Sequence, residues 1–124
     1  MKEIIYTPNA PEPIGPYSQA YLVNNVLYCS GQIPVNPQTG NVVEGGIKEQ
    51  SLQCIKNIQE VLSAANLNFE NVIKTTCFLA NMSDFAEFNN VYEQFFVSKP
   101  ARSCVAVKEL PKNVLVEIEV LASK

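Results

Sequence analysis

The alternation of apolar and polar residues predicts five strands in the chain. AYLVNNVLYCSG, at residues 20–31, is typical of two short strands around Asn24 and Asn25, which tolerate the positive φ of a tight turn. NVIKTTCFLA, at 71–80, is rich in β-branched residues and carries apolar residues on both alternating faces, Val72 and Phe78 on one of them. We therefore expect this third strand to be buried on both sides. SCVAV and NVLVEIEVLA predict two more strands, joined by KELPK.

Two segments have the spacing of amphipathic helices. In residues 47–65, apolar residues recur every three to five positions and polar residues fill the other side, and Asn66 is a reasonable stop. The second helix starts after Ser83 or Asp84, and Asp84 with Glu87 resembles a capping box. Pro100 blocks further helix. This segment carries an aromatic stripe that we expect to pack against the sheet. The stripe consists of Phe85, Phe88, Tyr92, Phe95 and Phe96.

The predicted order is β-β-α-β-α-β-β, which indicates an α+β fold with a mixed sheet and two helices packed on one face. The first twenty residues carry four prolines and are expected to form an ordered loop leading into strand. We expect residues 1–124 to form one domain. Two helices cover only one face of a sheet, so the other face needs a cover if its strands are apolar. The simplest cover is a second copy of the chain, and we expect a homo-oligomer.

Composition narrows the classes of function. Apolar residues make up 47% of the chain, yet no apolar run approaches the ~20 residues that span a bilayer, and the N-terminus does not resemble a signal peptide. We expect a cytoplasmic protein without a membrane partner. The net charge is −3 and the eight lysines are scattered, which disfavours nucleic acid as a partner.

The chain has no histidine, and its four cysteines form no C-x-x-C pair. This pattern excludes most zinc sites and the usual ligand sets of iron and copper, so no metal is expected. It also excludes catalysis that depends on an imidazole. The cysteines are expected to be small buried apolar residues. Chemistry must come from carboxylates, lysines, the arginine, hydroxyl groups, thiols, the backbone and water.

Arg102 is the only arginine, and it follows Pro100-Ala101 at the start of a predicted strand. One interpretation is a surface salt bridge, which contributes ~0–1 kcal/mol. The other is a two-pronged clamp for a carboxylate or phosphate, which the planar guanidinium makes and lysine cannot. The pattern leaves both open.

Glu117 interrupts an apolar strand. Alternation places Val116 and Ile118 on one face, with Glu117 and Glu119 on the other, the face that we expect a second copy to cover. A carboxylate there is solvated at an open edge, paired or functional.

Two further segments are candidates for ligand contact. Tyr17 follows the rigid Gly15-Pro16 turn, so its phenol either hydrogen-bonds a ligand or packs. Ser30-Gly31 ends a strand, where glycine permits close approach of a ligand to the backbone, although an ordinary strand exit has the same pattern.

Four stretches together resemble the RidA family of reactive-intermediate imine and enamine deaminases: IGPYSQA, SGQIPVNPQTG, VIKTTCFLANMSDFAEFNNVYEQFF and PARSCVAV…LPKNVLVEIE. The resemblance covers nearly the whole chain. Its most specific part is Pro-Ala-Arg-Ser at 100–103 followed by Val-Glu-Ile at 116–118.

The resemblance implies a chorismate-mutase-like sandwich that forms a homotrimer with clefts between subunits. It implies hydrolysis of 2-iminobutanoate and 2-iminopropanoate to 2-oxo acids and ammonia, without a cofactor. Arg102 matches the residue that binds the substrate carboxylate, and Glu117 matches the residue that orients water. Further residues match positions that line the cleft: Tyr17, Ser30, Gly31, Asn89 and Cys104.

Two alternatives stay open beside the deaminase. The same clefts could bind small carboxylates in a regulatory trimer without turnover. Endoribonuclease and translation-inhibitor activity is also attributed to the family, although the acidic net charge and the single arginine disfavour it. The chain departs from the family pattern in one place, because the segment 96–100 before Arg102 is shorter than in the family. This segment could border the cleft and so affect the range of substrates.

Overall fold

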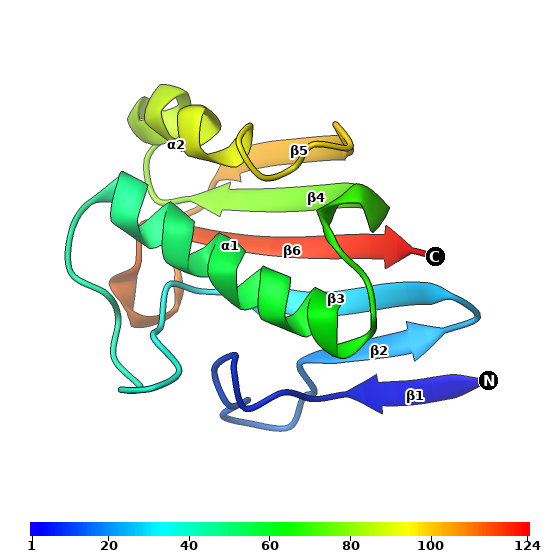
Figure 1. The fold of residues 1–124 in the computed structure, drawn as a ribbon. Coiled ribbons are helices and arrows are strands. Elements are labelled where there is room, and N and C mark those ends of the chain that lie inside the picture. The colour runs from blue at the N-terminus through cyan, green and yellow to red at the C-terminus, as the bar shows by residue number, and fades with distance from the viewer.

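The computed structural model describes residues 1–124, and its elements form two layers, a sheet and a pair of helices (Figure 1). The strands form one six-stranded sheet of order β1-β2-β3-β6-β4-β5, in which only β4 and β5 are parallel. The elements are β1 Lys2–Ile5, β2 Ala20–Val23, β3 Val26–Gln32, α1 Ile47–Ala64, β4 Val72–Leu79, α2 Phe85–Tyr92, β5 Ala101–Ala106 and β6 Val116–Ser123.

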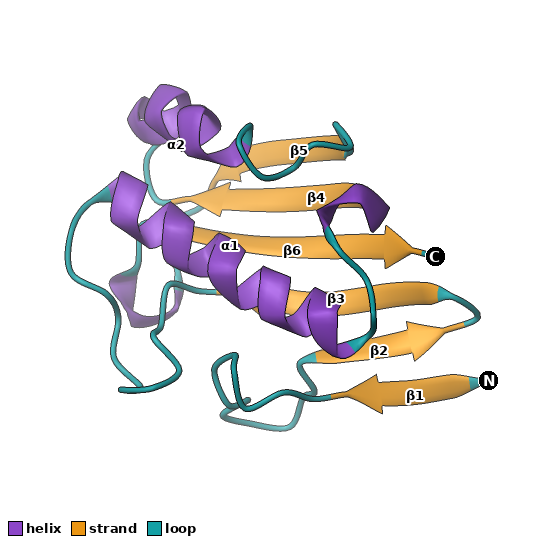
Figure 2. Cartoon of the chain, in the orientation of Figure 1, coloured by secondary structure: helices purple, strands orange, loops and turns teal.

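Both helices lie on the same face of the sheet, as Figure 2 shows, which confirms the predicted α+β class and layer arrangement. The core forms between them because α1 turns its apolar stripe toward β3 and β6. Ile58, Leu27 and Ile118 are fully buried there. Burial of each such side chain stabilises the fold by about 1.5–3 kcal/mol.

The other face of the sheet has no helix over it. Several of its apolar side chains are exposed to a third or more of their surface: Ile4, Tyr21, Tyr28 and Val105. We call this side the open face. These exposed apolar side chains are what we expect on a face that a second copy of the chain covers. The presence of that second copy stays a prediction.

The asparagines that the sequence analysis places at a turn and at a helix end adopt the expected positive φ. Asn24 and Asn25 both adopt positive φ (47° and 72°) in the turn between β2 and β3. Asn66, with φ of 60°, follows the end of α1. The second helix is shorter than the aromatic stripe predicts, because α2 ends at Tyr92 and the chain continues in turns. Asp84 makes no capping hydrogen bond, so the predicted capping box is wrong.

Two strand predictions are also corrected. The first twenty residues are not all loop, because Lys2–Ile5 pairs with β2 as an edge strand, so the sheet has six strands. A register shift between Val72 and Lys74 turns Val72 toward the helices, and Phe78 lies on the open face. The bulge therefore separates two residues that simple alternation places together.

Candidate active site

Glu117 projects from β6 onto the open face of the sheet. Its neighbours Val116 and Ile118 are fully buried on the helix side, while Glu117 is half-buried and Glu119 is exposed. Burial raises the pKa of the Glu117 carboxyl group above its usual range, and the nearby charge of Glu119 adds to the effect. A carboxylate with a raised pKa is a better proton acceptor at neutral pH.

The carboxylate of Glu117 packs directly against the backbone of Gly31. A register shift between Cys29 and Gln32 makes a bulge in β3 where Ser30 and Gly31 leave the regular pairing with β6. A Cβ atom added to Gly31 would overlap Oε2 of Glu117 and lie 2.9 Å from its Cδ. Only glycine leaves room for this carboxylate in its present position.

A cavity of about 370 Å³ lies beside this bulge. Tyr17 and Gly31 line it together, which brings two of the predicted residues to one place. Tyr17 is half-exposed (53%), and the Ser30 hydroxyl donates a hydrogen bond to the Ser18 carbonyl at 2.6 Å. The cavity also has walls that the sequence analysis did not single out, from Ile14, Gln19, Ile33, Pro111 and Lys112.

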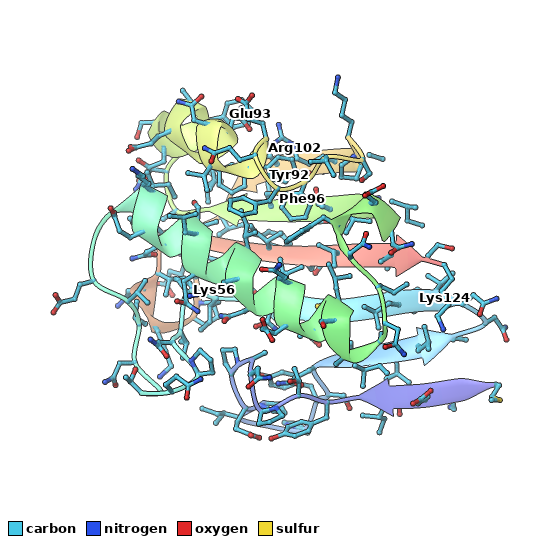
Figure 3. All side chains as sticks on the ribbon, in the orientation of Figure 1. Lys56, Tyr92, Glu93, Phe96, Arg102 and Lys124 are labelled. Carbon is cyan, nitrogen blue, oxygen red and sulfur yellow. The ribbon has the colours of Figure 1, made fainter.

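Arg102 lies at the other side of the sheet, against α2. Its Nη1 donates a hydrogen bond to Oδ1 of Asn89 at 2.7 Å. Its guanidinium carbon lies 4.8 Å from the ring centre of Tyr92 and 5.5 Å from that of Phe85. Figure 3 shows Arg102 and Tyr92 close together beside α2. The guanidinium is thus held in one orientation before any ligand arrives.

This second group of residues also lines a cavity, of about 620 Å³, whose walls include Asn89, Tyr92 and Arg102. Cys104 lies two residues beyond Arg102 on the same face of β5, paired with Cys77 of β4. Burial raises the pKa of the Cys104 thiol, against the opposing effect of the Arg102 charge. The thiol is therefore kept neutral and is a poor nucleophile, and Cys104 itself does not line either cavity.

One chain does not bring the two groups together. Arg102 pairs with Thr75 of β4, whereas Glu117 pairs with Phe78. Thr75 is buried under the helices and bonded to Tyr92, while Phe78 faces the open side. The predicted residues thus divide into an open-face group of Tyr17, Ser30, Gly31 and Glu117 and a helix-face group of Asn89, Arg102 and Cys104.

Tyr92 and Phe85 are the residues of this site whose role the sequence analysis missed. The prediction that the aromatic stripe packs in the core holds for Phe88 and for most of Tyr92. The signal was the position of the two rings, seven residues and so about two helical turns apart, on the side of α2 that meets the strand with the only arginine. No group of three or more His, Cys, Asp or Glu side chains lies close enough together to hold a metal ion.

No helix is long and apolar enough to cross a membrane.

Comparison with known proteins gives close relatives over the full chain. A RutC family protein of Pyrococcus horikoshii is 53% identical over 100% of this chain and 99% of its own length. The human protein named 2-iminobutanoate/2-iminopropanoate deaminase is 46% identical over 98% of this chain and 90% of its own length.

The fold has equally close counterparts. A Yersinia pestis structure, described as YyfA of the conserved Rid protein family, superposes with a TM-score of 0.97 at 48% identity and covers 100% of both chains. The family model described as Endoribonuclease L-PSP matches residues 7–124. The chain therefore belongs to the endoribonuclease L-PSP family, the YjgF/RidA family to which its sequence motifs point.

Proposed function

We propose that this protein hydrolyses reactive 2-imino acids, such as 2-iminobutanoate and 2-iminopropanoate, to 2-oxo acids and ammonia. The observation that carries the proposal is the Glu117 carboxylate, which has a raised pKa and packs on Gly31 beside a cavity that Tyr17 lines. Family membership supports it, since a human relative bears the name of this deaminase.

Arg102 binds the carboxylate of the substrate in this proposal. The substrate is a small anion, and a guanidinium makes two parallel hydrogen bonds to a carboxylate. Asn89 and the rings of Tyr92 and Phe85 already orient the side chain of Arg102. Less conformational entropy is then lost when the substrate binds.

Glu117 acts on the water in the first step. The iminium carbon is electrophilic, and Glu117 accepts a proton as water adds to it, which gives a carbinolamine. The protonated Glu117 returns this proton to the nitrogen, and the C–N bond breaks as ammonia leaves. The regenerated Glu117 carboxylate takes the proton of the carbinolamine hydroxyl, whose oxygen becomes the ketone of the 2-oxo acid, and passes it to the ammonia, which departs as ammonium. Positioning and general-base help each contribute roughly 10²–10⁴-fold to such a step.

The proposal requires more than one copy of the chain, because Arg102 and Glu117 face opposite sides of the sheet. We propose a homotrimer in which β5, an edge strand, places Arg102 of one subunit over the open face of the next. The exposed apolar residues of that face support burial in such an interface. We place the protein in the cytoplasm, in keeping with its four free thiols.

The test generates 2-iminobutanoate with a threonine dehydratase and traps it with semicarbazide. The protein should suppress formation of the adduct, and Arg102→Ala should not, because loss of a buried charge partner costs about 3–5 kcal/mol. Lys108→Ala is the matched control, since Lys108 is an exposed cation outside both cavities. Near-wild-type suppression by Arg102→Ala would refute the role of the arginine.

Assays on the same purified protein distinguish the two alternative functions, a small-carboxylate regulator and an endoribonuclease. Binding of 2-oxobutanoate with no effect on the lifetime of the imine would refute turnover and identify a small-carboxylate regulator. RNA cleavage that survives stringent purification and disappears in Glu117→Ala would instead identify an endoribonuclease. The net charge of −3 disfavours that result.

A further inference from the structure

Tyr17 lies in a segment that has little structure of its own. The chain between β1 and β2, residues 6–19, contains no helix or strand. Tyr17 N–H donates to the Gly15 carbonyl at 2.9 Å, and Gly15 has φ of +138°, which side chains rarely permit. Such a local turn orients Tyr17 relative to Gly15 alone, so the position of the phenol depends on an anchor elsewhere.

Gln19 supplies this anchor through its side chain, which is 2% exposed. Its Oε1 accepts a hydrogen bond from Thr7 N–H at 2.7 Å. Its Nε2 donates to the carbonyls of Thr7 at 3.0 Å and Pro11 at 2.9 Å, with a longer contact to Ala10 at 3.4 Å. One buried amide thus ties residues 7–11 to the end of the loop that carries Tyr17, and without it the buried Thr7 N–H would lose its partner.

The same short segment is also joined to the Gly31 bulge. The Gln19 carbonyl accepts from Ser30 N–H at 2.9 Å, and the Ser18 carbonyl accepts from the Ser30 hydroxyl at 2.6 Å. Gly31 follows immediately and supports the Glu117 carboxylate. Gln19 therefore connects the loop that carries Tyr17 to the bulge that holds Glu117, and it lines the cavity between them.

We propose that Gln19 is a positioning residue that sets the place of the Tyr17 phenol relative to Glu117. Gln19 acts through Tyr17 and does not touch the reacting atoms. This inference rests on the proposed deaminase function for its kinetic effect, although the geometric effect on Tyr17 is independent of that function.

A double-mutant cycle tests the coupling. Gln19→Met keeps the length and volume of the side chain but removes its hydrogen bonds. It should lower kcat/KM on the order of 10-fold, since displacement of a substrate contact by about 1 Å has effects of this size or larger. In a Tyr17→Phe background the same change should cost less than about 3-fold, because the contact is already lost. Equal losses in both backgrounds would overturn the proposal, since they indicate a structural role only.

A second measurement does not depend on activity. Fluorotyrosine incorporated into the protein gives a fluorine NMR resonance for Tyr17, assigned from its absence in Tyr17→Phe. Gln19→Met should shift or broaden that resonance and leave the one from Tyr92 in place. An unchanged Tyr17 resonance would overturn the inference. If the wild-type protein shows no imine hydrolysis but the resonance moves, the proposed function fails and the positioning role stands.

The control is Asn71→Leu, which removes a comparable side-chain tie, from Asn71 Nδ2 to the Ser123 carbonyl at 3.1 Å. Asn71 lies at the far end of β6 from Glu117, so Tm should fall while kcat/KM and the Tyr17 resonance stay constant. If Gln19→Met does not fold, Gln19→Glu takes its place. That variant retains the acceptor for Thr7 N–H and replaces the amide donor.

Discussion

The side chains of Arg102 and Glu117 project from opposite faces of one sheet, although both of their strands pair with β4. Arg102 is level with Thr75 and Glu117 with Phe78, and residues three apart in a regular strand face opposite ways. A small imino acid cannot reach both groups in a single chain. In the proposed function, each site therefore takes its arginine from one subunit and its glutamate from another.

Subunits that are inactive alone should restore each other. We expect Arg102→Ala chains and Glu117→Gln chains to be inactive separately and to regain about a quarter of wild-type activity after refolding together in equal amounts, since each interface draws its two residues at random. Semicarbazide trapping measures the activity, and size-exclusion chromatography with distinct tags checks co-assembly. Mixed oligomers without activity would contradict a shared site.

Replacement of Asn89 by Asp should weaken substrate binding without unfolding the protein. A carboxylate at the position of Oδ1, 2.7 Å from Nη1 of Arg102, would compete with the substrate for the guanidinium. A charge-assisted hydrogen bond of ~1.5–3 kcal/mol corresponds to an increase in KM of about 10- to 100-fold, with Tm unchanged or higher. Steady-state kinetics and thermal melts check this, and an unchanged KM would show that Arg102 is not the carboxylate site.

Gly31→Ala should displace Glu117 while the fold survives. The added methyl group would overlap Oε2 of Glu117, which lies at the end of a flexible side chain and can move away. We expect kcat to fall about 10²-fold, in line with misplacement of a general base, with a small change in Tm. Gly46→Ala is the control, because a Cβ atom there meets no neighbour within 4 Å. Full activity in Gly31→Ala would separate Glu117 from catalysis.

The pH dependence of activity should report Glu117. Burial raises its pKa, so the enzyme-dependent rate should fall as pH decreases, with a midpoint above the ordinary range of a glutamate. Glu117→Asp should retain an acid limb and Glu117→Gln should have almost no rate at any pH. A rate that stays constant down to the usual glutamate pKa would contradict the role of this group.

The ionisation of Glu117 should also affect folding stability. Activity is expected to rise with pH, whereas the free energy of unfolding is expected to fall. A raised pKa means that the folded state binds the proton more tightly than the unfolded state, so ionisation of Glu117 destabilises the fold as pH rises past the ordinary glutamate range. Glu117→Gln should therefore be more stable than the wild type at neutral pH and equal to it in acid. Because Glu117 is half-exposed, solvent screening keeps the gain below about 1 kcal/mol. Urea titrations across the pH range measure the difference.

A charge on the open face should disrupt assembly. Tyr28 is 48% exposed on this face, in the row formed with Tyr21 and Leu121 and away from Glu117. Tyr28→Lys should shift the protein toward monomers at micromolar concentration and remove activity, with far-UV circular dichroism unchanged. Light scattering measures the size, and a monodisperse monomer for the wild type would contradict the proposed trimer.

Local interactions explain the elements that could be predicted from the sequence. The Asn24-Asn25 turn depends on the φ preference of adjacent residues, and α1 depends on a stripe of apolar residues that recurs with each turn. Both helices lie on one face, as the element order predicts. Strand β1 was missed because a short edge strand is stabilised by its partner β2, which a local pattern does not contain.

The sequence by itself determined the residue types of the site: one guanidinium, a carboxylate inside an apolar strand, a glycine at a strand exit and a tyrosine after a rigid turn. Only the tertiary structure decided which of them meet. Gly31 supports Glu117 because a bulge between β3 and β6 turns it toward that carboxylate, and Arg102 meets Asn89 because α2 packs beside β5. These contacts depend on strand register between distant segments. One residue of shift moves every side chain to the other face, so no local pattern specifies them.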